Sequence, residues 1–223
     1  MFLISSKIYI LMTKDIYSGK IISKKKNNVH FLLKIDKSLE YLPGQFISIF
    51  KKENDQLLRA KPYTLASLDQ RYVELYIGIV ENGEFSNYLD QLQINDDIYF
   101  KGPVGIPIEK KITSNNLIII TLGCGIATYR AFIHHNVSKY NISLFFINKK
   151  KDVFFIEEFE ELSKRNKNFR YTEIVGKERQ DFNLEKEIRE NVTYLLSGPP
   201  KATEFYSQLL KKNNVNEQNI IIN

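Results

Sequence analysis

The sequence contains only one cysteine, Cys124, and three histidines. A single thiol excludes a disulfide framework, and it excludes an iron–sulfur cluster held by cysteines of this chain. The histidines, His30, His134 and His135, lack the spacing of metal ligands, and two adjacent residues on a helix point in different directions. We therefore expect no metal site.

The chain also lacks an apolar run long enough to cross a bilayer. Residues 1–12 are apolar except for Ser5, Ser6 and Lys7. This stretch is too short to span the hydrocarbon core, and no basic region precedes it. Met12 is an alternative start. We expect a soluble, cytoplasmic protein without a membrane partner.

Arginine is scarce, with 7 residues against 25 lysines in a chain of net charge +6. The positive charge is spread along the chain and forms no patch, which argues against nucleic-acid binding. It favours the approach of an acidic protein partner. With 223 residues, of which 43% are hydrophobic, the chain can form one large domain or two small ones.

Residues 16–108 have the pattern of an all-β domain that contains one helix, at Phe85–Gln91. Short strand-like segments are separated by turn residues. Six strands at this spacing predict a closed antiparallel barrel, which leaves no edge to pair wrongly. We assign residues 1–112 to this domain. The strands are expected at Ile16–Ser23, Val29–Ile35, Gln45–Phe50, Pro62–Ala66, Tyr72–Val80 and Asp97–Lys101.

The pattern changes after Lys110–Asn116, a polar segment that we interpret as a linker. Leu117–Leu122 is a continuous apolar run, typical of a parallel strand buried on both faces. Strands and helices then alternate, which predicts a doubly wound α/β domain over residues 113–223. Further strands are expected at Ile142–Ile147, Phe169–Val175, Val192–Ser197 and Asn219–Ile222, and helices at Ile126–His135, Phe155–Arg165, Leu184–Glu190 and Ala202–Lys212.

An extended segment around Tyr63 offers groups that suit a nucleotide. Strand faces alternate, so the cations Arg59 and Lys61 are expected on the same face as Tyr63. That face provides charges for a phosphate and a ring for stacking. Pro62 fixes φ before the tyrosine, and the neighbouring Thr64 hydroxyl can donate to a ring nitrogen.

Two turns are also suited to binding phosphates or a nucleotide. Gly83-Glu84-Phe85-Ser86 opens a predicted helix, whose free N–H groups and positive dipole end suit a diphosphate. Gly123-Cys124-Gly125-Ile126-Ala127-Thr128 is a glycine-rich strand-to-helix turn that lets the backbone approach a pyrophosphate. Ser197-Gly198-Pro199-Pro200 follows a later strand. For Cys124 itself, burial as a small hydrophobic residue is the alternative interpretation.

In this order the motifs resemble those of the ferredoxin–NADP reductase family, R-x-Y-S/T, G-x-x-S, G-T-G-I-A-P and C-G-P-P. The resemblance covers nearly the whole chain from about residue 15. It implies FAD and NADP as cofactors, with NAD as the alternative to NADP. It also implies that Tyr63 lies against the isoalloxazine and that Thr64 bonds near flavin N5. In relatives the cysteine of C-G-P-P, here Ser197, lies beside the nicotinamide.

The resemblance makes Tyr63, Thr64, Cys124 and Ser197 the catalytic candidates. The other cofactor-binding candidates are Arg59, Lys61, Pro62, Tyr76, Ile77, Gly78, Ile79, Gly83, Glu84, Phe85, Ser86, Gly123, Gly125, Gly198 and Pro199.

The chain departs from the family motifs at four positions, one of which is Cys124 in place of a threonine. Lys61 stands where the family has arginine; it keeps the charge but loses the bidentate fork, so we expect a weaker grip on phosphate. Thr128 replaces a proline. Ser197 replaces a cysteine, which predicts slower hydride transfer.

Lysines and an arginine follow two of the parallel strands. Lys149 comes after the second strand, and Lys177 and Arg179 come after the third. Cations at the carboxyl ends of these strands predict a pocket for the 2′-phosphate of NADP. Solvated surface charge is the alternative interpretation.

The implied reaction is hydride transfer from NADPH to bound FAD. Because the chain has no cluster of its own, its electrons would pass to a separate acceptor, such as the small acidic carriers ferredoxin and flavodoxin. Two alternatives remain. One is an NAD(P)H:flavin reductase that uses flavin as a substrate, and the other is a non-catalytic or subunit-bound electron-transfer module.

Overall fold

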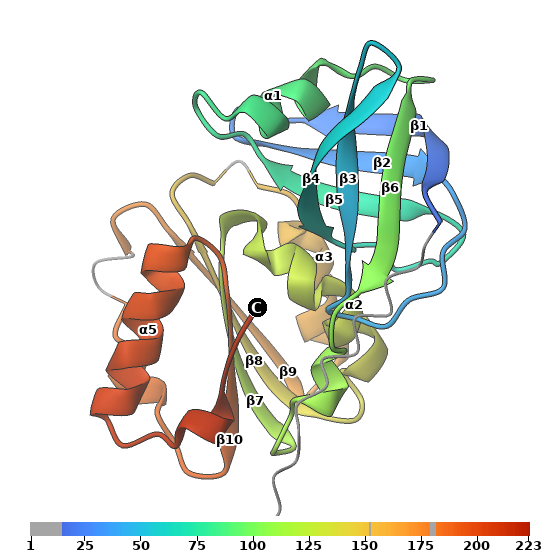
Figure 1. Ribbon diagram of the computed structural model, residues 1–223. Helices are drawn as coiled ribbons and strands as arrows, with labels where there is room; N and C mark the ends of the chain where they lie inside the picture. Colours follow the sequence, from blue (N-terminus) through green and yellow to red (C-terminus); the bar gives the residue numbers. More distant parts are fainter. Residues whose placement is uncertain (1–14, 152, 179–181) are drawn as a thin grey trace, which may run out of the picture.

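The computed structural model describes residues 15–151, 153–178 and 182–223. Figure 1 shows an antiparallel sheet above a parallel sheet that is flanked by helices. The first sheet has six strands and the second has five. The predicted fold class, an antiparallel barrel domain followed by a doubly wound α/β domain, is confirmed in its two-domain architecture.

The antiparallel sheet has the strand order β4-β3-β6-β1-β2-β5. Along β2, Phe31, Leu33 and Ile35 are fully buried while the residues between them are partly exposed. This alternation fills the interior of the curled sheet. The strands are β1 (Tyr17–Lys26), β2 (His30–Asp36), β3 (Phe46–Glu53), β4 (Gln56–Thr64), β5 (Val73–Gly78) and β6 (Asp97–Val104), and the helix is α1 (Glu84–Gln91).

The predicted closure of this sheet is incomplete. β4 and β5 stand at its two ends, and no ladder joins them within the described residues. The sheet is therefore barrel-like and not a closed barrel. The chain spans the gap just past β4, where the Ala66 N–H donates to the Glu74 carbonyl at 2.9 Å.

The parallel sheet has the order β11-β10-β7-β8-β9, with the first strand, β7, at its centre. Leu117 and Ile119 belong to the core beneath α2 and α3, whereas Ile118 and Ile120 belong to the core beneath α5. Both faces of β7 are buried, which explains its continuous apolar run. The elements are β7 (Asn116–Leu122), α2 (Ala127–Asn136), β8 (Asn141–Asn148), α3 (Ile156–Arg165), β9 (Phe169–Val175), β10 (Val192–Ser197), α5 (Pro200–Lys212) and β11 (Ile220–Ile222).

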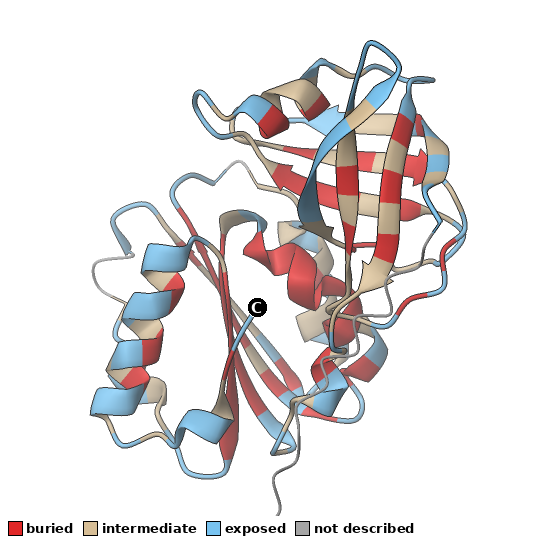
Figure 2. Ribbon diagram, viewed as in Figure 1, coloured by how far each residue is buried: buried red, intermediate tan, exposed pale blue. Residues whose placement is uncertain are grey.

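Helix α2 is buried on nearly all sides, unlike α5, which exposes one face (Figure 2). Tyr129 and Phe132 of α2 share a core with the parallel strands and also with Ala66 and Tyr76 of the antiparallel domain. The helix is therefore the layer between the two sheets. No helix within the described ranges is long and apolar enough to cross a membrane.

One predicted strand begins too late and one predicted helix is largely absent, whereas the other predicted ends lie within three residues of those observed. β4 starts at Gln56 and not at Pro62, because it forms a hairpin with β3 across Asn54 and Asp55. Both turn residues have positive φ, 47° and 61°, as a two-residue hairpin turn requires.

The predicted helix Leu184–Glu190 is a single 3₁₀ turn, η3 (Leu184–Glu187). The chain becomes extended at Ile188, and the Tyr194 hydroxyl accepts a hydrogen bond from the Arg189 N–H at 2.9 Å. This tertiary contact satisfies a backbone donor that a longer helix would have used itself.

Candidate active site

A cavity of about 600 Å³ is lined by residues of both domains. Its volume lies in the usual range of small-molecule sites, roughly 300–1,000 Å³. Most of the residues that the sequence predicts for the cofactors line it: Arg59, Lys61, Pro62, Tyr63, Thr64, Tyr76, Ile77, Gly78, Gly83, Glu84, Phe85, Ser86, Cys124, Gly125, Ser197 and Gly198.

Other predicted residues do not line this cavity; they are Ile79, Gly123, Lys149, Lys177 and Pro199. Ile79 packs instead against the antiparallel core. Lys149 and Lys177 are exposed on the loops beyond β8 and β9. Arg179 lies outside the described residues. Its predicted role, like those of the two lysines, stays a prediction.

The end of β4 forms one wall of the cavity. Tyr63 and Thr64 are half-buried there, and the Tyr63 ring lies 6.1 Å from that of Phe85, centroid to centroid. Burial, with a smaller effect of Cys124, raises the pKa of Tyr63 to about 12. The phenol is therefore protonated at neutral pH and can donate a hydrogen bond.

The expected alternation on one face holds for Lys61 and Tyr63, which pair regularly with Ile49 and Ile47 of β3, but not for Arg59. The β3–β4 register shifts at Phe50, and Arg59 has a positive φ of 26° at this bulge. A bulge adds one residue to a strand and so breaks the two-residue repeat. Arg59 nevertheless lines the cavity, where its guanidinium pairs with Glu84 at 3.2 Å.

Lys61 is the better placed cation for an anionic ligand. It is exposed at the cavity wall and, within the described residues, has no carboxylate at ion-pair distance. Glu84, by contrast, is held by both Lys51 and Arg59, each at 3.2 Å. The acidic charge at the start of α1 is thereby neutralised.

The Gly83–Ser86 turn is closed by the serine side chain. The Ser86 hydroxyl accepts from the Val80 N–H at 3.2 Å and donates to the Gly83 carbonyl at 3.3 Å. A Cβ on Gly83 would lie 2.8 Å from both Ser86 Oγ and Val80 Cβ. The turn therefore requires glycine, and it leaves the start of α1 facing the cavity.

The two turns of the parallel sheet pack directly on each other. A Cβ on Gly125 would lie 2.5 Å from the Ser197 carbonyl oxygen. The buried hydroxyls of Thr128 and Ser197 are 3.1 Å apart and hydrogen-bonded. Because β7 and β10 are adjacent, the sequence motifs around Cys124 and Ser197 form one continuous wall.

Cys124 is exposed to the cavity, so its interpretation as a small buried residue was wrong. A Cβ on Gly78 would lie 3.3 Å from the Cys124 sulfur, so a glycine at this position keeps the two domains in close contact. The thiol can be reached by solvent but is surrounded by protein atoms of both walls. This desolvation raises its pKa, although a hydrogen bond from the Gly78 backbone opposes the effect.

The raised pKa of Cys124 predicts slow reaction with thiol reagents at neutral pH. The thiolate is the reactive form, and an ordinary cysteine titrates near about 8.5. The rate of disulfide exchange with a chromogenic reagent, measured against pH, should therefore have its midpoint above that value. A midpoint at or below it would contradict the desolvated environment.

Sequence reasoning missed four lining residues: Val80, Ala127, Thr128 and Asn223. Ala127 and Thr128 belong to the glycine-rich motif and could have been assigned from it. Asn223 had no sequence signal. It reaches the cavity because β11 pairs with β10, and its side-chain amide donates to the Tyr129 hydroxyl at 2.9 Å.

The cavity fits a dinucleotide cofactor in its chemistry. It has aromatic and aliphatic walls, a lysine that forms no ion pair with a carboxylate among the described residues, and glycines at which an added Cβ would press on neighbouring wall atoms. No group of three or more metal-ligating side chains exists among the residues that the structure describes.

Comparisons with known proteins agree with this arrangement. Residues 14–107 match the family of oxidoreductase FAD-binding domains. The chain is 26% identical over 162 residues to one of the subunits of the Na⁺-translocating NADH-quinone reductase of Haemophilus ducreyi, covering 63% of this chain and 39% of that protein. It is 26% identical over 180 residues to NADH-cytochrome b5 reductase 1 of Dictyostelium discoideum, covering 72% and 63%. It thus spans less than two thirds of either relative.

The same fold occurs in a ferredoxin–NADP⁺ reductase from Neisseria gonorrhoeae, solved with bound FAD and NADP. The two structures superpose with a TM-score of 0.78 at 16% identity, over 93% of this chain and 98% of the other. Together with the family match, this supports FAD and a nicotinamide dinucleotide as the cofactors. Residues 14–107 thus match oxidoreductase FAD-binding domains, and the chain shares its fold with a ferredoxin–NADP⁺ reductase.

Proposed function

We propose that this chain transfers a hydride from NADPH to bound FAD and passes the electrons to a separate small acidic carrier, such as ferredoxin or flavodoxin. One observation carries the proposal. A single cavity joins Tyr63 and Thr64 of one domain to Cys124, Ser197 and Gly198 of the other. Groups suited to a flavin and groups suited to a nicotinamide therefore face each other.

Each wall has a distinct task in this proposal. Tyr63 covers the flavin ring, Thr64 bonds at its edge, and Lys61 with the start of α1 holds the diphosphate. The turns at Gly125 and Ser197 hold the nicotinamide half of the coenzyme. FAD, when bound, would supply the two-electron acceptor for the hydride; the protein orients the two rings and excludes water.

A visible spectrum of the purified protein tests the function. We expect the two absorption bands of a bound flavin, and we expect NADPH to bleach them under anaerobic conditions. A protein that takes up no FAD would contradict the proposal and favour a non-catalytic module. Flavin that is lost on gel filtration but still reduced in solution would favour a flavin reductase.

Replacing Lys61 with alanine should weaken FAD binding about tenfold or more, because a charge-assisted hydrogen bond is worth about 1.5–3 kcal/mol. Arginine at this position should tighten binding, since its planar fork matches a phosphate. Titration of the flavin-free protein with FAD measures both. Lys25→Ala, an exposed lysine of β1 away from the cavity, is the control. Equal effects of Lys61→Ala and Lys25→Ala would reassign the phosphate contact to the backbone.

We assign the preference for NADPH to the loops that follow β8 and β9. The Gly176 N–H donates to the Asn148 carbonyl at 3.1 Å, so the loops that carry Lys149 and Lys177 run side by side. Lys177→Ala should raise the KM for NADPH and leave that for NADH nearly unchanged. Lys212→Ala, at the far end of α5, is the matched control. If the wild type uses NADH and NADPH equally well, these lysines do not select the 2′-phosphate and are ordinary surface charges.

A further inference from the structure

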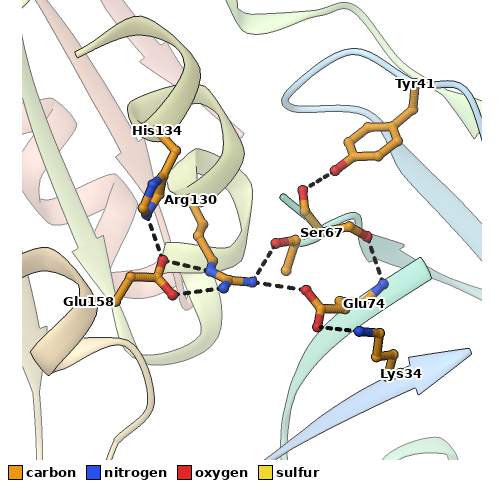
Figure 3. Close-up of polar contacts among 8 residues, drawn as sticks. Lys34, Tyr41, Ser67, Glu74, Arg130, His134 and Glu158 are labelled. Carbon is orange, nitrogen blue, oxygen red and sulfur yellow. Dashed lines mark hydrogen bonds and ion pairs between the residues drawn. The ribbon is translucent and has the colours of Figure 1, made fainter. Parts of the chain in front are cut away.

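One buried arginine connects the two domains. Arg130 of α2 is 8% exposed, and its Nη1 donates to the Ala66 carbonyl at 2.8 Å and to Glu74 at 3.2 Å. Both acceptors belong to the antiparallel domain. Its Nε and Nη2 donate to the two carboxylate oxygens of Glu158 in α3, at 2.8 and 2.7 Å (Figure 3). One rigid guanidinium therefore holds acceptors from both domains.

Ala66 and Glu74, the two acceptors in the antiparallel domain, are close in sequence to residues that line the cavity. Ala66 lies two residues beyond Thr64, and Glu74 lies two residues before Tyr76. On the other side, Arg130 lies in the first turn of α2, which follows directly from the glycine-rich turn. The hydrogen bonds of Arg130 thus join the two opposing walls of the cavity through residues that are close in sequence to the lining residues.

The flavin-side end of this contact is itself held in place. The Glu74 N–H donates to the Ser67 hydroxyl at 2.7 Å, the Tyr41 hydroxyl donates to the Ser67 carbonyl, and Lys34 lies 4.0 Å from the Glu74 carboxylate. These contacts leave Ala66 and Glu74 little freedom to follow the arginine if the domains separate.

The nucleotide-side end is equally constrained. Glu158 also bonds to His134 at 2.8 Å, and the Arg130 guanidinium lies 4.3 Å from the centre of the Phe155 ring. Phe155 stands at the start of α3 with a positive φ of 77°. Helices α2 and α3 therefore present Arg130 to the other domain in a fixed orientation.

We propose that Arg130 is a positioning residue that fixes the separation of the two cavity walls, and with it, on the proposed function, the distance between nicotinamide and flavin. The arm to Glu158 stays inside one domain and holds the guanidinium. The arm to Ala66 and Glu74 crosses between the domains and sets the separation. Loss of the crossing arm should loosen the cavity without unfolding either domain.

Two conservative substitutions test this proposal. Arg130→Lys keeps the charge but cannot reach Glu158 together with Ala66 and Glu74. Glu74→Gln removes the negative charge of the crossing arm and leaves the arm to Glu158 intact. The control is Lys139→Gln, which removes the ion pair with Glu109 at 2.9 Å on the surface. All variants are made in the full chain.

The first readout needs no cofactor. Cys124 faces the cavity, so its reaction with a thiol reagent reports how open the two walls are. We expect Arg130→Lys and Glu74→Gln to react at least about fivefold faster than the wild type and Lys139→Gln to react at the wild-type rate. Unchanged thiol rates in both variants, with a lowered thermal midpoint, would reduce Arg130 to a stabilising residue and overturn the proposal.

The second readout is flavin reduction by NADPH in a single turnover. Small misplacements of reacting groups lower rates by about a hundredfold per ångström, so we expect a tenfold or larger loss at unchanged FAD content. An unchanged reduction rate in both variants would overturn the positioning role. If the wild type binds no FAD, the proposed function fails, while the thiol readout still decides whether Arg130 sets the cavity.

Discussion

Replacing Arg130 with alanine should lower the free energy of unfolding by about 3–5 kcal/mol. The change removes the guanidinium from Glu158 and Glu74, whose side chains are only 24% and 19% exposed, and breaking a buried ion pair from one side has an effect of this size. Urea denaturation followed by circular dichroism measures it. Arg165→Ala is the matched control, because Arg165 is exposed and pairs with Glu161 on the surface of α3. Such a pair contributes only about 0.3–0.5 kcal/mol. Equal losses in the two variants would contradict the structural role of Arg130.

The difference between wild type and Arg130→Ala should shrink in acid. Burial alone would raise the pKa of Glu158, but hydrogen bonds from His134 and Arg130 outweigh it and hold that pKa below its usual range. A carboxyl group whose pKa is lower in the folded state stabilises the fold above its unfolded pKa, about 4.3 for glutamate. This stability is lost as the pH falls from there through the folded pKa. Urea denaturation of both proteins at pH 7 and below pH 4.3 measures this, and we expect the smaller difference in unfolding free energy at the lower pH.

Gly125→Ala should abolish most NADPH-driven flavin reduction, with a loss of about a hundredfold. Its Cβ would lie 2.5 Å from the Ser197 carbonyl oxygen and 2.8 Å from the Gly198 nitrogen. Both are backbone atoms, so one of the two turns must move, and a shift near an ångström has an effect of this order on a reaction rate. FAD content should stay unchanged, because the predicted flavin contacts lie in the other domain. Stopped-flow absorbance measures the rate.

The control for Gly125 is the glycine two residues earlier in the same turn. A Cβ on Gly123 would have only the ring nitrogen Nε2 of His30 nearby, at 3.5 Å. Gly123→Ala therefore adds the same atom without a clash. Its main penalty is conformational, since φ is 56°, and amounts to about 1–2 kcal/mol of stability. A similar fall in reduction rate for both variants would show that the turn responds to any added methyl group.

Local patterns were sufficient for the order and type of most elements. The run Leu117–Leu122 predicted a strand buried on both faces, and the structure places one helix layer on each side of it. The hairpin at Asn54 and Asp55 was missed, although two residues that tolerate positive φ gave a usable signal. No local signal showed that the predicted helix after Leu184 would stop early. The chain leaves the helical conformation there, and the Arg189 N–H bonds to the Tyr194 hydroxyl of β10.

The amino-acid sequence alone determined which functional groups the site contains, because the order and spacing of the motifs bring Tyr63, Cys124 and Ser197 to one cavity. Only the tertiary structure decided how these residues are held. The bulge at Arg59 depends on register with β3, and the exposure of Cys124 depends on where the two domains meet. Arg130 belongs to no sequence motif, because its hydrogen-bond partners lie 64, 56 and 28 residues away in sequence. Contacts between residues so distant are set by packing of whole domains, which no local pattern encodes.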